Sequence, residues 1–228
     1  VAPSGAYFKV GSGGIHAFDA DGTEVWFKRR PVADEGNEWA YGAIAIAPSG
    51  DLFVTDSVRD LIQRYDAEGN FVEQWGATGV RDGEFRWPGD VAVGADGTIY
   101  VADTLNRRIQ AFREDGGFLR QWPVTGARFP LVVDVDADGA VYVLVYGDEV
   151  QKYGPDGDLI TTFGGSGSDP GQFLGARGMA VGPDRRVYVS DAGGQRIHVF
   201  VPMPGAATST PAPTPVTPAT CAVRAEKN

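Results

Sequence analysis

Residues 90–122 read DVAVGADGTIYVADTLNRRIQAFREDGGFLRQW, and this stretch contains four short runs of alternating apolar and polar residues. The runs cover residues 90–94, 98–103, 108–112 and 118–122. Tight Asp-Gly turns, at Asp96-Gly97 and Asp115-Gly116, separate the first run from the second and the third from the fourth. An Asp-Gly pair between alternating runs is a strong hairpin signal, because both central turn positions need a positive φ. The stretch therefore predicts four antiparallel strands.

The same pattern recurs along the chain. A run that closes on an aromatic residue occurs five times, in steps of 47, 47, 41 and 47 residues, ending at Phe18, Tyr65, Phe112, Tyr153 and Phe200. Repeats of about 40–50 residues with four strands each are typical of β-propeller blades. Such a sheet cannot cover both of its own faces, whereas packing of blades around an axis buries them. We therefore predict an all-β fold, a β-propeller of four-stranded antiparallel blades over residues 1–201.

The amino-acid composition excludes or disfavours several classes of protein and of site. The chain has 32 glycines among 228 residues, about twice the average share, which suits many tight turns. The net charge of −10 disfavours a nucleic-acid partner, because that affinity depends on cations that neutralise phosphates. The single cysteine, Cys221, excludes an internal disulfide and a multi-cysteine metal site. No apolar run reaches the about 18 residues of a membrane span, so we expect none in this chain.

Several segments of the repeat resemble the NHL repeat. The third unit carries WPGDVAV at 87–93, TIYVAD at 98–103 and NRRIQ at 106–110, and the fifth carries GMAV at 178–181 and VYVSD at 187–191. The connectors GEF at 83–85 and GQF at 171–173 are similar to the lead-in of this family. The resemblance covers residues 5–201 and implies an NHL-type β-propeller, similar to sensor domains of bacterial receptor kinases and to secreted NHL proteins. The fourth unit departs from the pattern, with LVY at 144–146 where the second strand should end in aspartate.

The first and last of the five repeats are incomplete. The first has no opening strand, and the fifth has no closing strand after Phe200. Both fragments contain the third strand of the repeat, so they cannot combine into one shared blade. The resemblance implies a six-bladed ring of which this chain supplies part. The other interpretation is a five-bladed ring with trimmed terminal blades.

Residues 202–228 differ in character from the repeats. Six prolines are interspersed with threonine and serine there, and such a segment has little to bury and favours extended polyproline II. We predict a disordered Thr/Pro-rich linker or stalk. Because stalks of this composition are typical of proteins outside the cytoplasm, we expect an extracytoplasmic location, secreted or at the cell surface.

The order of the strands places the tight turns on one face of the propeller and the longer connectors on the other. Loops on a rigid scaffold carry function, so the connector face is the candidate binding surface. Arginine and tryptophan are enriched at interaction hot spots. The ligand-binding candidates are Trp39, Arg81, Trp87, Arg107, Arg128 and Arg177. The alternative for the two tryptophans is that both indoles fill gaps between blades.

Metal ligands are sparse in this sequence. Asp134, Asp136 and Asp138 form a D-x-D-x-D-G pattern that is similar to the start of a calcium loop. The bidentate glutamate expected at position twelve of such a loop is Val145 here, so calcium is a weak candidate. His16 and His198 fill equivalent slots of different blades, at least about 10 Å apart, which is too far for one zinc ion. We expect no metal and no cofactor.

These features favour a non-catalytic propeller that binds a protein, peptide or glycan through its loop face. Asp103 with Arg108, and Asp191 with Arg196, recur at the same offset in two blades, which indicates structural pairs rather than an active site. The sequence has no Gly-x-Ser-x-Gly nucleophile elbow. The alternatives are a calcium-dependent lyase or hydrolase on a propeller and, less favoured, an RNA-binding protein.

Overall fold

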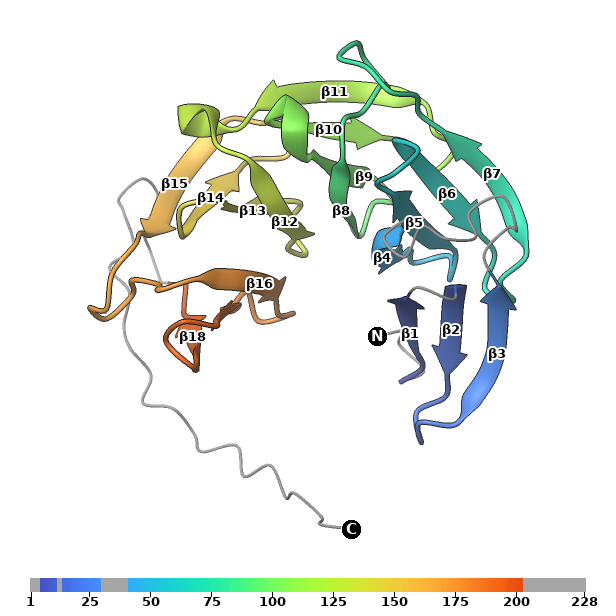
Figure 1. Cartoon of the computed structure of the whole chain (residues 1–228), viewed down its shortest axis with the longest axis horizontal. Helices are drawn as coiled ribbons and strands as arrows, with labels where there is room; N and C mark the ends of the chain where they lie inside the picture. The colour runs from blue at the N-terminus through green and yellow to red at the C-terminus, as the bar shows by residue number, and fades with distance from the viewer. Residues whose placement is uncertain (1–4, 12–13, 30–40, 203–228) are drawn as a thin grey trace.

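The computed structural model describes residues 5–11, 14–29 and 41–202 of the chain. Within these residues, eighteen strands form five antiparallel sheets, and strands that are consecutive within a sheet pair with each other. The sheets are arranged as blades around an axis (Figure 1), which confirms the predicted β-propeller. None of the helical segments in these ranges has the length and apolarity needed to cross a membrane.

The first three blades contain the strands of the amino-terminal half. Blade 1 consists of β1 (Tyr7–Gly11), β2 (Gly14–Phe18) and β3 (Glu24–Arg29). Blade 2 consists of β4 (Tyr41–Ile46), β5 (Leu52–Asp56), β6 (Leu61–Tyr65) and β7 (Phe71–Trp75). Blade 3 consists of β8 (Pro88–Val93), β9 (Ile99–Asp103), β10 (Arg108–Phe112) and β11 (Phe118–Pro123). The short 3-10 helix η2 (Thr104–Asn106) joins β9 to β10.

The remaining two blades follow the same plan. Blade 4 consists of β12 (Pro130–Val135), β13 (Val141–Val145), β14 (Glu149–Tyr153) and β15 (Leu159–Gly164), and η3 (Thr125–Ala127) precedes it. Blade 5 consists of β16 (Ala176–Val181), β17 (Val187–Asp191) and β18 (Arg196–Phe200). Strands β4, β8, β12 and β16 lie nearest the axis, whereas β3, β7, β11 and β15 form the rim (Figure 1).

The core of the protein lies between the blades. Tyr100 and Val101 are neighbours on β9, yet Tyr100 packs in the cluster shared with blade 4 and Val101 in the cluster shared with blade 2. All five residues of β9 are buried, because successive side chains of a strand point to opposite faces and both faces are covered. A strand buried on both faces can be almost continuously apolar, as IYVAD is here.

The two terminal blades contain three described strands each. Blade 1 has no described strand in the innermost position, and blade 5 has none at the rim, as the sequence predicts. Their outward faces are open: Ile197 on β18 is 64% exposed, whereas Ile109, at the matching position of blade 3, is buried. The five blades therefore form an arc that is open between the first and the last (Figure 1).

Candidate functional site

Two connectors between blades share one design. Phe85, near the end of the connector into blade 3, is fully buried and bridges to Thr78 at the connector's start. Phe173 and Ser166 repeat this arrangement in the connector into blade 5. Each phenylalanine fills the space between two sheets and fixes the course of its connector. The connector face therefore has a rigid base.

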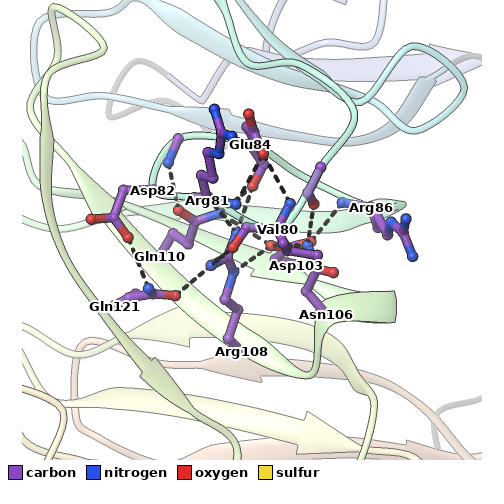
Figure 2. A network of polar contacts seen from close by, with 12 residues as sticks. Val80, Arg81, Asp82, Glu84, Arg86, Asp103, Asn106, Arg108, Gln110 and Gln121 are labelled. Atoms are coloured by element: carbon purple, nitrogen blue, oxygen red, sulfur yellow. Dashed lines mark hydrogen bonds and ion pairs between the residues drawn. The ribbon is translucent and has the colours of Figure 1, made fainter.

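A buried carboxylate holds the first of these connectors to blade 3 (Figure 2). Asp103, at the end of β9, accepts hydrogen bonds from the Arg86 amide at 2.8 Å and from Asn106 Nδ2 at 2.9 Å through its two oxygens. Its Oδ2 also accepts from Arg108 Nε at 2.7 Å. Burial raises the pKa of Asp103, and the hydrogen bonds from Arg86, Asn106 and Arg108 offset part of that rise. The carboxylate is thus fully engaged with the protein itself.

The guanidinium of Arg108 is equally occupied. Its Nη1 donates to the carbonyl of Val80 at 2.8 Å and to Gln121 Oε1 at 2.6 Å, and its Nη2 donates to the carbonyls of Arg81 and Glu84. With the bond to Asp103, all five donors of the side chain have acceptors. This pair leaves no donor for a ligand, which confirms that Asp103 and Arg108 are structural.

Blade 5 repeats the clamp with a histidine added. Asp191 accepts from the Leu174 amide at 2.9 Å, from Arg196 Nε at 3.3 Å and contacts His198 Nε2 at 3.4 Å. Arg196 also donates to the carbonyl of Gln172. His198 therefore belongs to a structural clamp, and His16 lies at the other end of the arc, where its Nδ1 is 3.3 Å from Glu24.

The three aspartates of the calcium-like pattern do not converge. Asp134 accepts from the Val181 amide of the next blade at 2.7 Å, while Asp136 accepts from two amides of its own turn and from the Tyr142 hydroxyl. Asp138 pairs with Arg185 at 2.7 Å. In the described ranges no three His, Cys, Asp or Glu side chains are grouped as a metal site would require. The linear pattern is thus divided among three separate interactions.

Two carboxylates link the innermost strands. Asp90 on β8 accepts from the Val133 amide of β12 at 2.9 Å, and Asp134 on β12 makes the equivalent bond to β16. These bonds satisfy inner-edge amides that have no further strand to pair with. Burial, together with the charge of Asp134, raises the pKa of Asp90 to about 7 despite two amide hydrogen bonds.

The raised pKa of Asp90 predicts a pH-dependent stability. The unfolded chain loses this proton near pH 3.9, so the free energy of unfolding should fall as the pH rises from about 4 to 7 and then level off. Asp90→Asn cannot ionise, and we expect its urea unfolding to lack this decline. Asp115→Asn is the control, since hydrogen bonding by the Gly117 amide lowers the pKa of exposed Asp115. Both states of that group lose their proton by about pH 4, so this variant should keep the decline between pH 4 and 7. Equal pH slopes for wild type and Asp90→Asn would contradict the assignment.

A band of exposed and half-buried side chains lies on the connectors of blades 3 and 4. The Arg86 carbonyl accepts from the Leu105 amide at 3.0 Å, and the Trp87 carbonyl accepts from the Thr104 amide. The Arg107 guanidinium lies 4.6 Å from the ring centroid of Phe129, whose carbonyl accepts from the Tyr146 amide. Arg128 reaches the Tyr146 carbonyl at 3.4 Å. We define the connector strip as Arg86, Trp87, Leu105, Arg107, Arg128, Phe129 and Tyr146.

The backbone of Trp87 in the connector strip has an unusual conformation. Its φ of +55° is unusual for a bulky residue, a conformation that costs on the order of 1–3 kcal/mol. The amide of Trp87 donates to Asp60 Oδ1 at 2.7 Å, and Thr78 Oγ1 donates to the other oxygen of that buried carboxylate. The indole is 50% exposed. The alternative in which this indole fills a gap between blades is therefore wrong for Trp87.

Other tryptophans fill the gaps instead. Trp122 is buried and lies directly over Gly157, where a Cβ atom would come within 2.7 Å of the indole. Trp75 lies over Gly116 in the same way. Both residues are on fourth strands, so the position in the blade separates packing indoles from the exposed one. Trp39 lies outside the described residues.

The structure brings some of the predicted ligand-binding residues together and separates others. Trp87, Arg107 and Arg128 lie in the connector strip, whereas Arg81 is exposed beside the buried clamp and uses its carbonyl there. Arg177 is exposed on β16 of blade 5, and none of its described contacts reaches the strip. Leu105 and Phe129 are not among the candidates predicted from the sequence. The available signal for Phe129 is that Phe129-Pro130 matches Trp87-Pro88.

The comparisons with known proteins agree with this architecture. The profile of the NHL repeat matches residues 85–112 and 173–200. No curated protein matches the chain. Among solved structures, selenomethionine-substituted virginiamycin B lyase from Staphylococcus aureus is similar with a TM-score of 0.66 and 17% identity, over 88% of this chain and 64% of that one.

Two further structures show the same likeness. A protein of unknown function from Bacteroides caccae has a TM-score of 0.59 and 16% identity, over 86% of this chain and 68% of that one. Hydrazine synthase from Kuenenia stuttgartiensis has a TM-score of 0.57 and 14% identity, over 72% of this chain and 46% of that one. At these identities the likeness shows the fold alone, and the chain spans less than two thirds of the length of the lyase.

Proposed function

We propose that this β-propeller, in which residues 85–112 and 173–200 match the NHL repeat, is a non-catalytic scaffold that holds a protein, peptide or glycan on the connector strip. The observation that carries the proposal is the half-exposed indole of Trp87, which projects from a strained backbone held by the buried carboxylate of Asp60. Strained residues that their surroundings hold in place cluster at ligand-binding sites. A backbone segment that is ordered before binding also loses less entropy when a partner arrives.

The chemistry of the connector strip supports binding rather than catalysis. Its seven residues offer rings, an aliphatic chain and guanidinium groups, whereas general acid–base catalysis uses groups that exchange protons near neutral pH. The acid–base side chains of the clamps, such as Asp103 and Asp191, are occupied by the protein's own donors. Tryptophan and arginine together are typical of interaction hot spots.

A propeller enzyme is the second candidate. It is favoured by the likeness to virginiamycin B lyase, which is limited to the fold at 17% identity. The carboxylates that a calcium-dependent lyase or hydrolase would use, Asp134, Asp136 and Asp138, are engaged in separate contacts. RNA binding is supported only by the arginines of the strip and is opposed by the net charge of −10.

We also propose an extracytoplasmic location, secreted or at the cell surface. This proposal is supported by the Thr/Pro-rich composition of residues 202–228, which lie outside the described residues apart from Pro202. A segment of this composition would act as a stalk that holds the propeller away from its point of attachment.

Removal of the Trp87 indole tests the binding proposal. We expect labelled chain to be retained by members of an immobilised peptide and glycan array, and Trp87→Ala to weaken that retention at least about tenfold, the range of hot-spot residues. The thermal midpoint should stay nearly unchanged because the indole is half-exposed. The control is Ile160→Ala, an exposed apolar residue on the rim of blade 4. Unchanged retention, or a large loss of stability, would assign Trp87 a structural role instead.

A further inference from the structure

Two guanidinium groups of the connector strip have no acidic partner among the described residues. Most arginines in the described part of the chain pair with carboxylates, as Arg64 does with Asp51 at 2.6 Å and Arg196 with Asp191. Arg86 uses its backbone in the clamp, and its side chain points away from the network (Figure 2). Arg107 stacks on Phe129 instead of pairing with an acid. Unpaired arginines are unexpected in a chain with a net charge of −10.

The two arginines are held in place by their backbones. Arg107 ends η2 with a φ of +57°, and its amide donates to the Thr104 carbonyl at 3.1 Å. The Arg86 carbonyl accepts from Leu105, two residues before Arg107. Leu105, which is exposed, is therefore fixed beside Arg86 and two residues from Arg107, and Trp87 adjoins Arg86 in the chain. Cationic and apolar residues thus neighbour one another along the connector strip.

The stacking of Arg107 on Phe129 determines which N–H donors of its guanidinium are available to a ligand. A guanidinium that lies on an aromatic face keeps the N–H donors of its edge free for a ligand. Such planar donors match the two oxygens of a carboxylate, and charge-assisted hydrogen bonds of this kind are about twice as strong as neutral ones. The side chain is thus oriented before any ligand arrives.

From this juxtaposition we propose that the ligand of the connector strip is an acidic peptide segment, with carboxylates on Arg86 and Arg107 and apolar side chains on Trp87 and Leu105. The inference rests on the proposed function and specifies its partner. A neutral glycan would leave both cations without a counterpart. A nucleic acid carries one negative charge per nucleotide, and the net charge of −10 would repel it strongly. A peptide with two or three acids among apolar residues suits a local cationic site in an acidic protein.

The probes are two pools of fluorescein-labelled hexapeptides with random apolar residues at alternate positions. One pool has Asp or Glu at the other positions, and the second has Asn or Gln. By fluorescence anisotropy with the full chain, we expect the acidic pool to bind at least about tenfold more tightly than the amide pool at low salt. Arg86→Gln and Arg107→Gln should each lower the affinity for the acidic pool about tenfold and leave the affinity for the amide pool unchanged. The control is Arg113→Gln, which removes an equal charge from an exposed ion pair with Asp115. It should change the affinity for neither pool.

The outcomes separate this inference from the proposed function. Equal binding of the two pools, or binding of the acidic pool that depends on Trp87 but not on Arg86 or Arg107, would overturn the acidic ligand and leave the scaffold proposal standing. Tighter binding of a labelled single-stranded oligouridine that depends on both arginines would overturn the peptide in favour of RNA. If Trp87→Ala alters no binding at all, the scaffold proposal itself fails.

Discussion

Arg108→Met is expected to lower the free energy of unfolding by about 3–5 kcal/mol, the loss typical of removing one partner from a buried ion pair. The substitution leaves the carboxylate of Asp103 buried without its cation. It also leaves three backbone carbonyls, those of Val80, Arg81 and Glu84, without their guanidinium donor. Methionine keeps the length of the side chain, so the change reports mainly the lost polar contacts.

Urea unfolding of the full chain measures this effect, and Arg113→Met is the matched control. Arg113 pairs with Asp115 at the surface, where both side chains are more than half exposed, and such a pair contributes little to stability. A loss of less than about 1 kcal/mol for Arg108→Met would mean that the clamp does not hold the connector to blade 3.

Phe85→Ala should produce a loss of similar size, about 3–5 kcal/mol, because a large ring is removed from a fully buried position. Phe85 packs between blades 2 and 3, with its ring centroid 5.6 Å from that of Phe112. The cavity cannot close easily, since it is bounded by two sheets and by Gly76, which lies against the same ring.

The matched control for this substitution is Phe71→Ala on the rim of blade 2, where the side chain is 55% exposed. We expect that change to cost less than about 1.5 kcal/mol by its partial loss of buried apolar area. Equal losses at the two positions in chemical denaturation would show that Phe85 is not the plug between the blades.

The fold could be predicted because each blade repeats its own local signals. The Asp-Gly turn before Ile99 and the aromatic that closes β10 are visible in the sequence alone, as is the Asp103–Arg108 offset. The departure of the fourth unit is also visible in the sequence, and the structure gives its form: Val145 lies where Asp103 lies in blade 3, and Glu149 lies where Arg108 lies. There Arg128 supplies the cation from the connector, 3.9 Å from Glu149.

The connector strip is harder to predict from the sequence than the fold, because it depends on contacts between blades. The positive φ of Trp87 is maintained by Asp60, 27 residues earlier in the chain, and no glycine marks the position. Similarly, Asp134 and Asp136 are two residues apart, yet one contacts the next blade and the other its own turn. A linear pattern of carboxylates cannot reveal such a division.

The connector that carries Arg86 and Trp87 is fastened to two blades at once, to blade 2 through Asp60 and to blade 3 through Asp103. A molecule seated on those side chains would therefore brace the joint between neighbouring sheets. Separation of these two sheets would disrupt the binding site. By the same linkage, the bound molecule would make separation of the two sheets less favourable. Occupancy and mechanical stiffness of the propeller would then rise and fall together.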